Sequence, residues 1–352
     1  MANKIELGSE FELDINKLKI TTNNIRNYFK EYATNWYDLG RSAIRHIPFC
    51  RTKKILLPEY ICESVIKCFD IDKISFYKID DDLTINESVL DMINEDVGTI
   101  YICHYFGYCQ DESLLHSIKQ KCDKYDILII EDSTQSMFSV HNYIGDYMVA
   151  SIRKWIPVPC GGVLFSNSKK LPSMEEIVKR TDDNKFYGMV LKQLHLDKNL
   201  DVNEQYRKIF VSSEENFDEQ KNIYGISDLS AFLIECANVD ELISIRKRNA
   251  SYLQERIGRL GIDIVRKFNE SECPLVVLVR VNNRDDFRKY LIDNRIYCAV
   301  HWPFDGIKKE ERLNAAEYAG KLLSLPIDQR YGTKEIDYMI KVIEGYGGKL
   351  TF

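Results

Sequence analysis

The feature that most limits the fold is an alternation of short apolar runs with amphipathic patterns between residues 38 and 167. Residues 62–69 and 112–124 carry apolar side chains at helical spacing. The runs around them are rich in β-branched or aromatic residues, which is typical of buried strands. The alternation predicts an α/β fold with a mainly parallel central sheet flanked by helices. The predicted strands are residues 55–57, 73–79, 98–103, 127–130 and 162–165.

The pattern changes towards the end of the chain. A polar region at residues 168–225 predicts loops and helices over the core, and residues 228–257 predict one long helix capped by Ser227. We therefore predict a large α/β domain at residues 1–240, which includes the N-terminal segment, and a smaller α+β domain at residues 241–352. In the smaller domain we expect strands at residues 262–267, 275–281 and 297–302, and helices at 284–294 and 334–343.

Composition excludes several classes of function. Asp and Glu (54) outnumber Lys and Arg (48), so no basic excess marks a nucleic-acid-binding protein. No apolar run is long enough to span a membrane, and acidic residues stand where a signal peptide needs an apolar stretch. Ten cysteines without a C-x-x-C pair predict free thiols, no metal site and a cytoplasmic protein.

Motifs for other common cofactors and catalytic types are absent. The chain contains no G-x-G-x-x-G, no G-x-x-x-x-G-K-[ST], no H-E-x-x-H and no G-x-S-x-G. Nicotinamide-dependent, nucleoside-triphosphate-dependent and serine-hydrolase chemistry therefore have no support in the sequence.

Polar residues follow two of the apolar runs, at the edge where α/β sheets usually bind ligands. Asp132 stands at the end of the run that begins at Ile127, and Gln135 follows three residues later. Lys154 follows a second apolar run and precedes a Pro-rich loop and the pair Gly161-Gly162. The turn Arg41-Ser42-Ala43 has small residues suited to opening a helix whose free N–H groups bind an anion.

An anion site, a carboxylate, an amide and a lysine are the groups that pyridoxal 5'-phosphate (PLP) needs. The phosphate requires N–H donors and a hydroxyl, and the pyridine nitrogen requires an Asp that keeps it protonated. The phenolic oxygen requires a donor such as an amide, and the aldehyde forms a Schiff base with a Lys. Each piece alone is more often structural, as a helix cap, a surface lysine or a simple turn. Their order and spacing together predict a PLP site.

Further short motifs extend this pattern over most of the chain. The most specific are Ile130-Glu-Asp-Ser-Thr-Gln135 and the spacing of seven residues from Lys154 to the first glycine of Gly161-Gly162. Together they resemble the DegT/DnrJ/EryC1/StrS family of fold type I PLP-dependent aminotransferases, best known for aminating nucleotide-linked keto sugars. Looser matches to this family lie at residues 57–60, 103–107, 296–303 and 323–326.

The resemblance implies a role for each matched residue. Lys154 would form the Schiff base, Asp132 would pair with the pyridine nitrogen, and Gln135 would face the phenolic oxygen. A homodimer is also implied, with each active site completed by the partner subunit. The candidates for the phosphate are Ser151, Arg41, Ser42 and Ala43, those for the rest of the cofactor pocket are Tyr60 and His104, and those for the substrate are His301 and Tyr105.

Two segments depart from the family pattern. The family's Ser precedes its Lys by five residues, whereas Ser151 precedes Lys154 by three. The family's Asn-Tyr-Arg segment, which reaches the partner's active site, is replaced by Tyr224-Gly-Ile-Ser227. These departures indicate a divergent branch with a smaller or different substrate.

The predicted activity is transfer of an amino group from a small-molecule donor, with glutamate expected, to a keto acceptor. The acceptor would be a nucleotide-linked keto sugar or a small ketose phosphate, and the product would serve polysaccharide or secondary-metabolite biosynthesis. PLP-dependent lyases, decarboxylases and dehydratases are alternatives on the same fold. Dehydrating relatives carry His in place of the Lys, so Lys154 argues against them. A non-catalytic regulatory protein is the third alternative, and it would have no use for a Schiff-base lysine.

Overall fold

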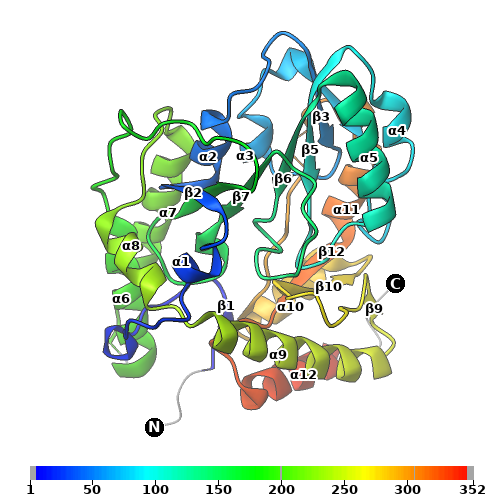
Figure 1. The fold of residues 1–352 in the computed structure, drawn as a ribbon. Coiled ribbons are helices and arrows are strands. Elements are labelled where there is room, and N and C mark those ends of the chain that lie inside the picture. Colours follow the sequence, from blue (N-terminus) through cyan, green and yellow to red (C-terminus); the bar gives the residue numbers. More distant parts are fainter. Residues whose placement is uncertain (1–4, 199, 305, 347–352) are drawn as a thin grey trace.

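The computed structural model describes residues 5–198, 200–304 and 306–346, and a seven-stranded sheet lies at its centre (Figure 1). From one edge to the other, the strands are β2 (Ala33–Tyr37), β8 (Gly162–Ser166), β7 (Tyr147–Ser151), β6 (Leu128–Asp132), β5 (Val97–Cys103), β3 (Lys54–Pro58) and β4 (Ile74–Tyr77). Neighbours from β7 to β4 pair in parallel, whereas β8 is antiparallel to both β7 and β2. The predicted α/β class with a mainly parallel sheet is confirmed.

The sequence predicts most of this sheet but not all of it. The predicted strands correspond, within a few residues, to β3, β4, β5, β6 and β8. The sequence does not predict β2, because it is an edge strand of mixed exposure whose apolar pattern is weak. β7 stands out only as an apolar run, although four of its five residues are buried.

Helices cover both faces of the central sheet because successive strand residues point to opposite sides. Ile100 of β5 packs in the cluster with α5 (Glu112–Tyr125), and the adjacent Tyr101 packs on the other face with α2 (Gly40–His46) and α3 (Glu63–Ile66). The α5 helix confirms the one predicted at residues 112–124. The other helices of this part are α1 (Ile25–Tyr28), α4 (Val89–Met92), α6 (Asn184–Lys198) and α7 (Asn203–Glu219).

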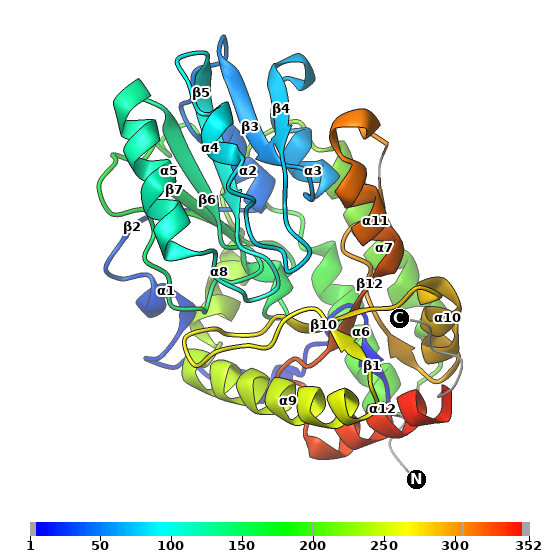
Figure 2. The same ribbon diagram turned by 90° about the vertical axis from the view of Figure 1, so that its right-hand side faces the viewer.

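The C-terminal part of the chain builds a second, smaller sheet with its own apolar core (Figure 2). In order across this sheet, the strands are β12 (Leu322–Pro326), β10 (Val276–Arg280) and β9 (Asp263–Ile264), and both pairs are antiparallel. The helices around it are α9 (Val239–Arg259), α10 (Arg284–Asp293), α11 (Leu313–Lys321) and α12 (Thr333–Tyr346), whereas α8 (Asp228–Glu235) packs against α1 in the core beside the central sheet. Short 3-10 helices occupy Ile15–Lys17, Ile71–Lys73, Ile152–Lys154 and Lys309–Glu311. Within the described ranges, no helix is long and apolar enough to cross a membrane.

The prediction of a single helix over residues 228–257 is wrong. The chain leaves helical geometry after Cys236, which separates α8 from α9. Ser227 caps α8 as predicted, and the Asn238 side chain accepts a hydrogen bond from the Glu241 N–H at the start of α9. Each helix thus begins with its own N-cap, which is a local signal for two helices.

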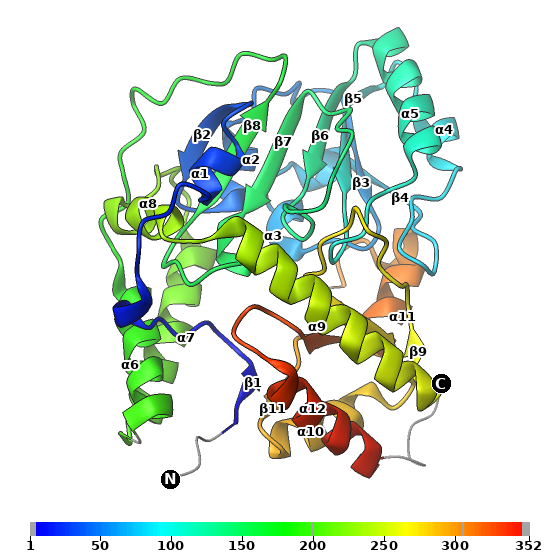
Figure 3. The same ribbon diagram turned by 60° about the horizontal axis from the view of Figure 1, so that its bottom comes forward.

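The N-terminal segment pairs with the C-terminal part rather than with the central sheet (Figure 3). β1 (Leu7–Gly8) is parallel to β11 (Ile296–Tyr297), and the Leu7 side chain is buried in the C-terminal core. Gly8 has φ +80°, and a Cβ atom there would lie 2.1 Å from the Tyr297 carbonyl oxygen, so this approach requires glycine. Further along the segment, Leu13 and Phe29 pack in the core beside the central sheet, so it is β1 that joins the C-terminal part. The predicted division into two domains, with its boundary near residue 240, stays a prediction.

Buried ion pairs anchor the N-terminal segment. The ammonium of Lys192 lies 3.2 Å from a carboxylate oxygen of Glu6 and 3.1 Å from one of Glu12, and the Lys192 side chain is 1% exposed. Arg330 contacts the same Glu12 carboxylate at 2.8 Å. Burial alone would raise the pKa of Glu12, but Arg330 and Lys192 beside it bring this pKa down to about 2.

We predict that Glu12→Gln lowers the free energy of unfolding at pH 7 by about 3 kcal/mol, because two buried cations lose a shared anion. The ordinary pKa of a glutamate is 4.5 and that of Glu12 in the fold is about 2, so its stabilisation is complete above pH 4.5 and is lost as pH falls towards 2. Urea unfolding curves should show that the difference in free energy of unfolding between variant and wild type becomes smaller as the pH falls from 4.5 towards 2.

The matched control is Glu31→Gln, because the Glu31 side chain is 80% exposed. This change should leave the unfolding curve nearly unchanged at every pH, since exposed ion pairs contribute little. An equal loss of stability at both positions would contradict the anchoring role of Glu12.

Candidate active site

A cavity of about 460 Å³ opens at the carboxyl ends of β6 and β7. The two strands are parallel neighbours, with Asp132 opposite Val149 in the register. Because both strands end at the same edge, Asp132 and Ser151 reach one cavity, and Lys154 joins them from the 3-10 turn after Ser151. The other predicted residues that line this cavity are Gln135, Arg41 and His301.

Asp132 is a buried carboxylate at the cavity wall. The Thr134 N–H donates to its Oδ1 at 2.8 Å, and the Tyr101 hydroxyl donates to its Oδ2 at 2.7 Å. Burial raises the pKa of the Asp132 carboxyl, while these two hydrogen bonds favour its charged form. Within the described part of the chain, no lysine or arginine forms an ion pair with it. The site therefore presents a desolvated carboxylate that a cationic ligand would stabilise.

Gln135 and Ser151 present hydrogen-bonding groups beside Asp132. The Gln135 Oε1 accepts a hydrogen bond from the Phe106 N–H at 3.1 Å. The Ser151 N–H donates to the Thr134 Oγ1 at 3.1 Å. The amide nitrogen of Gln135 and the hydroxyl of Ser151 have no hydrogen-bond partner among the residues that the structure describes, so both are available to a ligand.

The first turn of α2 lies against these strands because two glycines allow it to approach. A Cβ atom on Gly162 would lie 2.4 Å from both the carbonyl carbon and the carbonyl oxygen of Leu39. A Cβ atom on Gly40 would lie 3.4 Å from the Ser151 Cβ. The N–H groups at the first positions of a helix have no partner inside the helix. Gly40 and Arg41, at these first positions of α2, both line the cavity next to Ser151.

Ser42 and Ala43 lie behind this wall and do not line the cavity. The Ser42 hydroxyl donates to the Asp38 carboxylate at 2.7 Å. The N–H groups of Ser42 and Ala43 both donate to the Leu39 carbonyl, at 3.1 and 3.2 Å. Because these donors are already used inside the fold, the structure gives no support to the phosphate contact from Ser42 and Ala43, which stays a prediction.

His104 is buried and also lies outside the cavity lining. Its Nε2 is 2.8 Å from the Glu131 Oε2, and the Gln110 N–H donates to its Nδ1 at 3.3 Å. The other oxygen of Glu131 accepts from the N–H groups of Ile144 and Gly145. His104 therefore helps to fix the loop that precedes β7. Its predicted place in the cofactor pocket stays a prediction that the cavity lining does not support.

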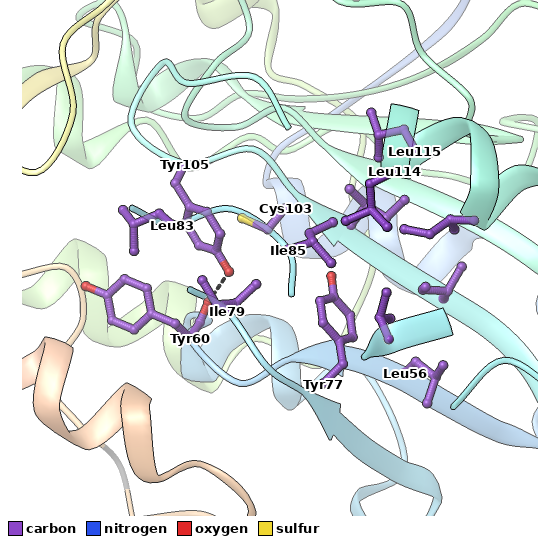
Figure 4. Close-up of a cluster of buried hydrophobic side chains, with 14 of the residues drawn as sticks. Leu56, Tyr60, Tyr77, Ile79, Leu83, Ile85, Cys103, Tyr105, Leu114 and Leu115 are labelled. Carbon is purple, nitrogen blue, oxygen red and sulfur yellow. Dashed lines mark hydrogen bonds between the residues drawn. The ribbon is translucent and has the colours of Figure 1, made fainter. Parts of the chain in front are cut away.

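Tyr60 and Tyr105 belong to a hydrophobic cluster beside the sheet (Figure 4). The Tyr105 hydroxyl donates to the Tyr60 carbonyl at 2.6 Å, and both side chains are almost completely buried. Neither residue lines the cavity. Their predicted contacts with cofactor and substrate stay predictions that the cavity lining does not support. Trp302, to which the sequence pattern assigns no role, is an aromatic residue that does line the cavity.

Lys154 lies in the cavity with a free amine. This amine makes no hydrogen bond or ion pair with another residue of the described ranges. His301 lines the same cavity, and its Nδ1 is 2.9 Å from the Ser324 Oγ. Burial and the nearby Lys154 ammonium lower the pKa of His301 to about 3. His301 is therefore neutral near pH 7 and adds a polar group without adding charge.

Helix α7 contributes two carboxylates to the cavity that the sequence pattern did not predict. Glu214 forms an ion pair with Arg153, and Asp218 pairs with Arg41 at 2.8 Å. The ring of Phe217 lies 4.4 Å from the Arg153 guanidinium. Residues 214 and 218 are one helical turn apart, so both face the cavity. Their acidic spacing in a helical register was the available signal, but residues 168–225 were expected only to cover the core.

Comparison with known proteins identifies the family. A model of the DegT/DnrJ/EryC1/StrS aminotransferase family matches residues 73–344. The chain belongs to this family. The predicted family, fold type and aminotransferase class are confirmed, and aminotransferases of this family use PLP.

Individual relatives are distant. A dTDP-3-amino-3,6-dideoxy-alpha-D-galactopyranose transaminase of Aneurinibacillus thermoaerophilus is 22% identical over 272 residues, which cover 72% of this chain and 67% of the relative. A structure described as a sugar aminotransferase of Streptococcus pneumoniae in its PMP form has a TM-score of 0.66 at 14% identity, over 90% of this chain and 86% of that chain. A GDP-4-keto-6-deoxymannose-3-dehydratase variant with bound GDP-perosamine has a TM-score of 0.62 at 17% identity, over 90% of each chain. At these identities the structural likenesses establish the fold.

We predict that Gly162→Ala destabilises the protein by about 1–3 kcal/mol, because its Cβ would overlap the Leu39 backbone and displace the first turn of α2. Urea unfolding measures the loss. Gly320→Ala in α11 is the control, since a Cβ atom at Gly320 would have no other atom within 4 Å and alanine favours a helix. Equal stability of the two variants would contradict the close packing described for Gly162.

Proposed function

We propose that this protein is a PLP-dependent aminotransferase that transfers an amino group to a keto sugar through Lys154. The observation that carries the proposal is the meeting of the Lys154 amine and the Asp132 carboxylate in one cavity, where neither has an ion-pair partner among the residues that the structure describes. Family membership supports the reaction class. The chemistry of the cavity residues supports PLP as the cofactor.

The residues of the cavity fit PLP. Asp132 offers a buried carboxylate that forms no ion pair with the described lysines and arginines, which suits a protonated pyridine nitrogen. Gln135 retains an amide donor for the phenolic oxygen. Ser151 and the first N–H groups of α2 suit the phosphate, and Lys154 suits the aldehyde. PLP, when bound, supplies a ring that accepts electrons from the substrate carbon that loses its proton.

The protein's own residues then perform three tasks. Asp132 would hold the protonated ring nitrogen: burial raises the pKa of its carboxyl, and the Thr134 N–H and the Tyr101 hydroxyl oppose this by favouring the ionised form. Lys154 takes a proton from the substrate carbon and returns it at a neighbouring position. Trp302 and His301 form part of the wall around the reacting groups, and His301 stays neutral.

We infer that the acceptor is a keto sugar and the donor is glutamate. The curated relative that matches this chain is a transaminase of a nucleotide-linked sugar, and a structural relative is described as a sugar aminotransferase. The acceptor would be a nucleotide-linked keto sugar or a small ketose phosphate, and either would place a carbonyl group near Lys154. We further propose that the protein is a homodimer, as the family resemblance implies, and that it is cytoplasmic, which its free cysteines support.

Dehydration is the second candidate reaction, because a sugar dehydratase shares the fold. Dehydrating members of the family carry histidine where this chain has Lys154. The lysine therefore favours amination. Release of an elimination product from a keto-sugar substrate would favour dehydration instead.

We predict that PLP gives the protein visible absorbance and that borohydride reduction fixes PLP to the peptide that contains Lys154, as measured by mass spectrometry. Lys154→Ala should abolish both signals and lower the rate of 2-oxoglutarate formation from glutamate by at least about 1000-fold, because the proton-transferring amine is lost. Asp132→Asn should bind PLP but slow the same reaction, since the ring nitrogen loses its anionic partner.

The control is Lys170→Ala, because Lys170 is an exposed lysine outside the cavity. This variant should keep the absorbance, the fixed adduct and the rate. A wild-type protein that stays colourless with PLP, or an adduct on another lysine, would refute the proposed function.

A further inference from the structure

A second cavity of about 480 Å³ adjoins the first at Lys154. Lys154, Arg153 and Glu214 line both cavities, so the reactive amine lies at their junction. The rest of the second lining comes from segments distant in sequence, including Phe11 near the N-terminus and Tyr297 in β11. This position, beside the amine and away from Asp132, suits the part of a substrate that extends from the reacting carbon.

Positive charge exceeds negative charge around this second cavity. Four of its lining residues are cationic and two are acidic. The cations are Arg153, Lys154, Lys185 and Arg288, and the acids are Glu10 and Glu214. A cavity with this balance attracts an anion.

The two carboxylates neutralise only part of the cationic set. Glu214 pairs with both Arg153 and Lys185, and Glu10 lies 2.9 Å from the Lys185 ammonium. Burial raises the pKa of Glu10, but Lys185, Arg153 and Lys154 bring it down to about 2, so Glu10 is charged at neutral pH. Arg153 and Lys185 therefore already have protein anions beside them. Lys154 is assigned to the cofactor, so Arg288 is the remaining cation of the second cavity that could bind an anionic ligand.

Arg288 has the geometry of a receptor for an anion. It lies on α10 and is partly buried, and its Nε donates to the Cys298 carbonyl at 2.9 Å. This bond fixes one edge of the planar guanidinium. Its two terminal nitrogens have no hydrogen-bond or ion-pair partner within the described ranges. A guanidinium held in this way offers paired donors to the two oxygens of a carboxylate or a phosphate.

We propose that the second cavity is a substrate subsite in which the Arg288 guanidinium binds an anionic group of the substrate. The proposal rests on the proposed function, because it takes Lys154 as the reacting amine. The shared ligand chemistry is a carboxylate or phosphate oxygen pair, supplied by a dicarboxylic amino donor or by a phosphorylated acceptor. Arg288 would then select charged substrates over uncharged ones of the same shape.

The test measures anion binding without turnover. Protein loaded with PLP and reduced with borohydride is titrated by calorimetry with 2-oxoglutarate in one arm and fructose 6-phosphate in the other. Arg288→Gln removes the charge but keeps a donor for the Cys298 carbonyl. It should weaken binding of at least one anion about tenfold or more. The anion whose binding is weakened shows whether the dicarboxylic donor or the phosphorylated acceptor supplies the group that Arg288 binds. Arg288→Lys should recover part of the affinity.

The matched control is Lys289→Gln, which removes one positive charge from the next residue of α10, an exposed residue outside the cavity. It should bind both anions within about twofold of wild type, and circular dichroism should show that all variants are folded. The proposal is overturned if wild type binds neither anion, if Arg288→Gln binds both as wild type does, or if Lys289→Gln reproduces the loss. If PLP fails to attach to Lys154, the proposed function fails, and the same titrations on untreated protein still decide the role of Arg288.

Discussion

The parallel register of β6 and β7 is the constraint on which the site depends. It brings the end of one strand, with the buried carboxylate of Asp132, next to the end of the other strand, which Lys154 follows. A buried carboxylate without a protein cation is costly, because desolvation disfavours its charge. Asp132 tolerates this position through hydrogen bonds from Thr134 and Tyr101. A cationic ring nitrogen would complete the charge balance that the protein alone leaves open.

The two neighbouring cavities carry charges of opposite sign. On the Asp132 side the free charge is negative, whereas around Arg288 the free charge is positive. Lys154 lies between these regions and makes no ion pair with the described residues. A molecule bound across both cavities would therefore meet opposite charges at its two ends, which fixes its orientation relative to the amine.

Local sequence predicted those site residues whose placement follows from strand ends. Asp132, Gln135 and Lys154 reach the cavity because they follow β6 and β7 at the edge where parallel strands open. Ser42 and His104 stand in equally suggestive motifs, but their polar atoms are used by Asp38 and Glu131. Such competition between partners arises only in the folded chain, so a motif cannot reveal it.

The same limit applies to groups brought in by distant segments. The carboxylates of α7 and the guanidinium of Arg288 depend on how helices pack over the sheet, and no spacing rule in the sequence places them. The pairing of β1 with β11 was unexpected for this reason also. Gly8 and Tyr331, which are joined by a hydrogen bond, are 323 residues apart in the chain.

This separation has a consequence for the order of folding. Contacts between remote segments carry a large loop-closure cost and form late. Phe11 and Tyr297, which line the second cavity together, lie towards opposite ends of the stretch of chain that the Gly8–Tyr331 hydrogen bond closes. During synthesis the central sheet can therefore assemble while this cavity is still incomplete, and a nascent chain would acquire its cofactor-binding surface before it acquires the means to select a substrate.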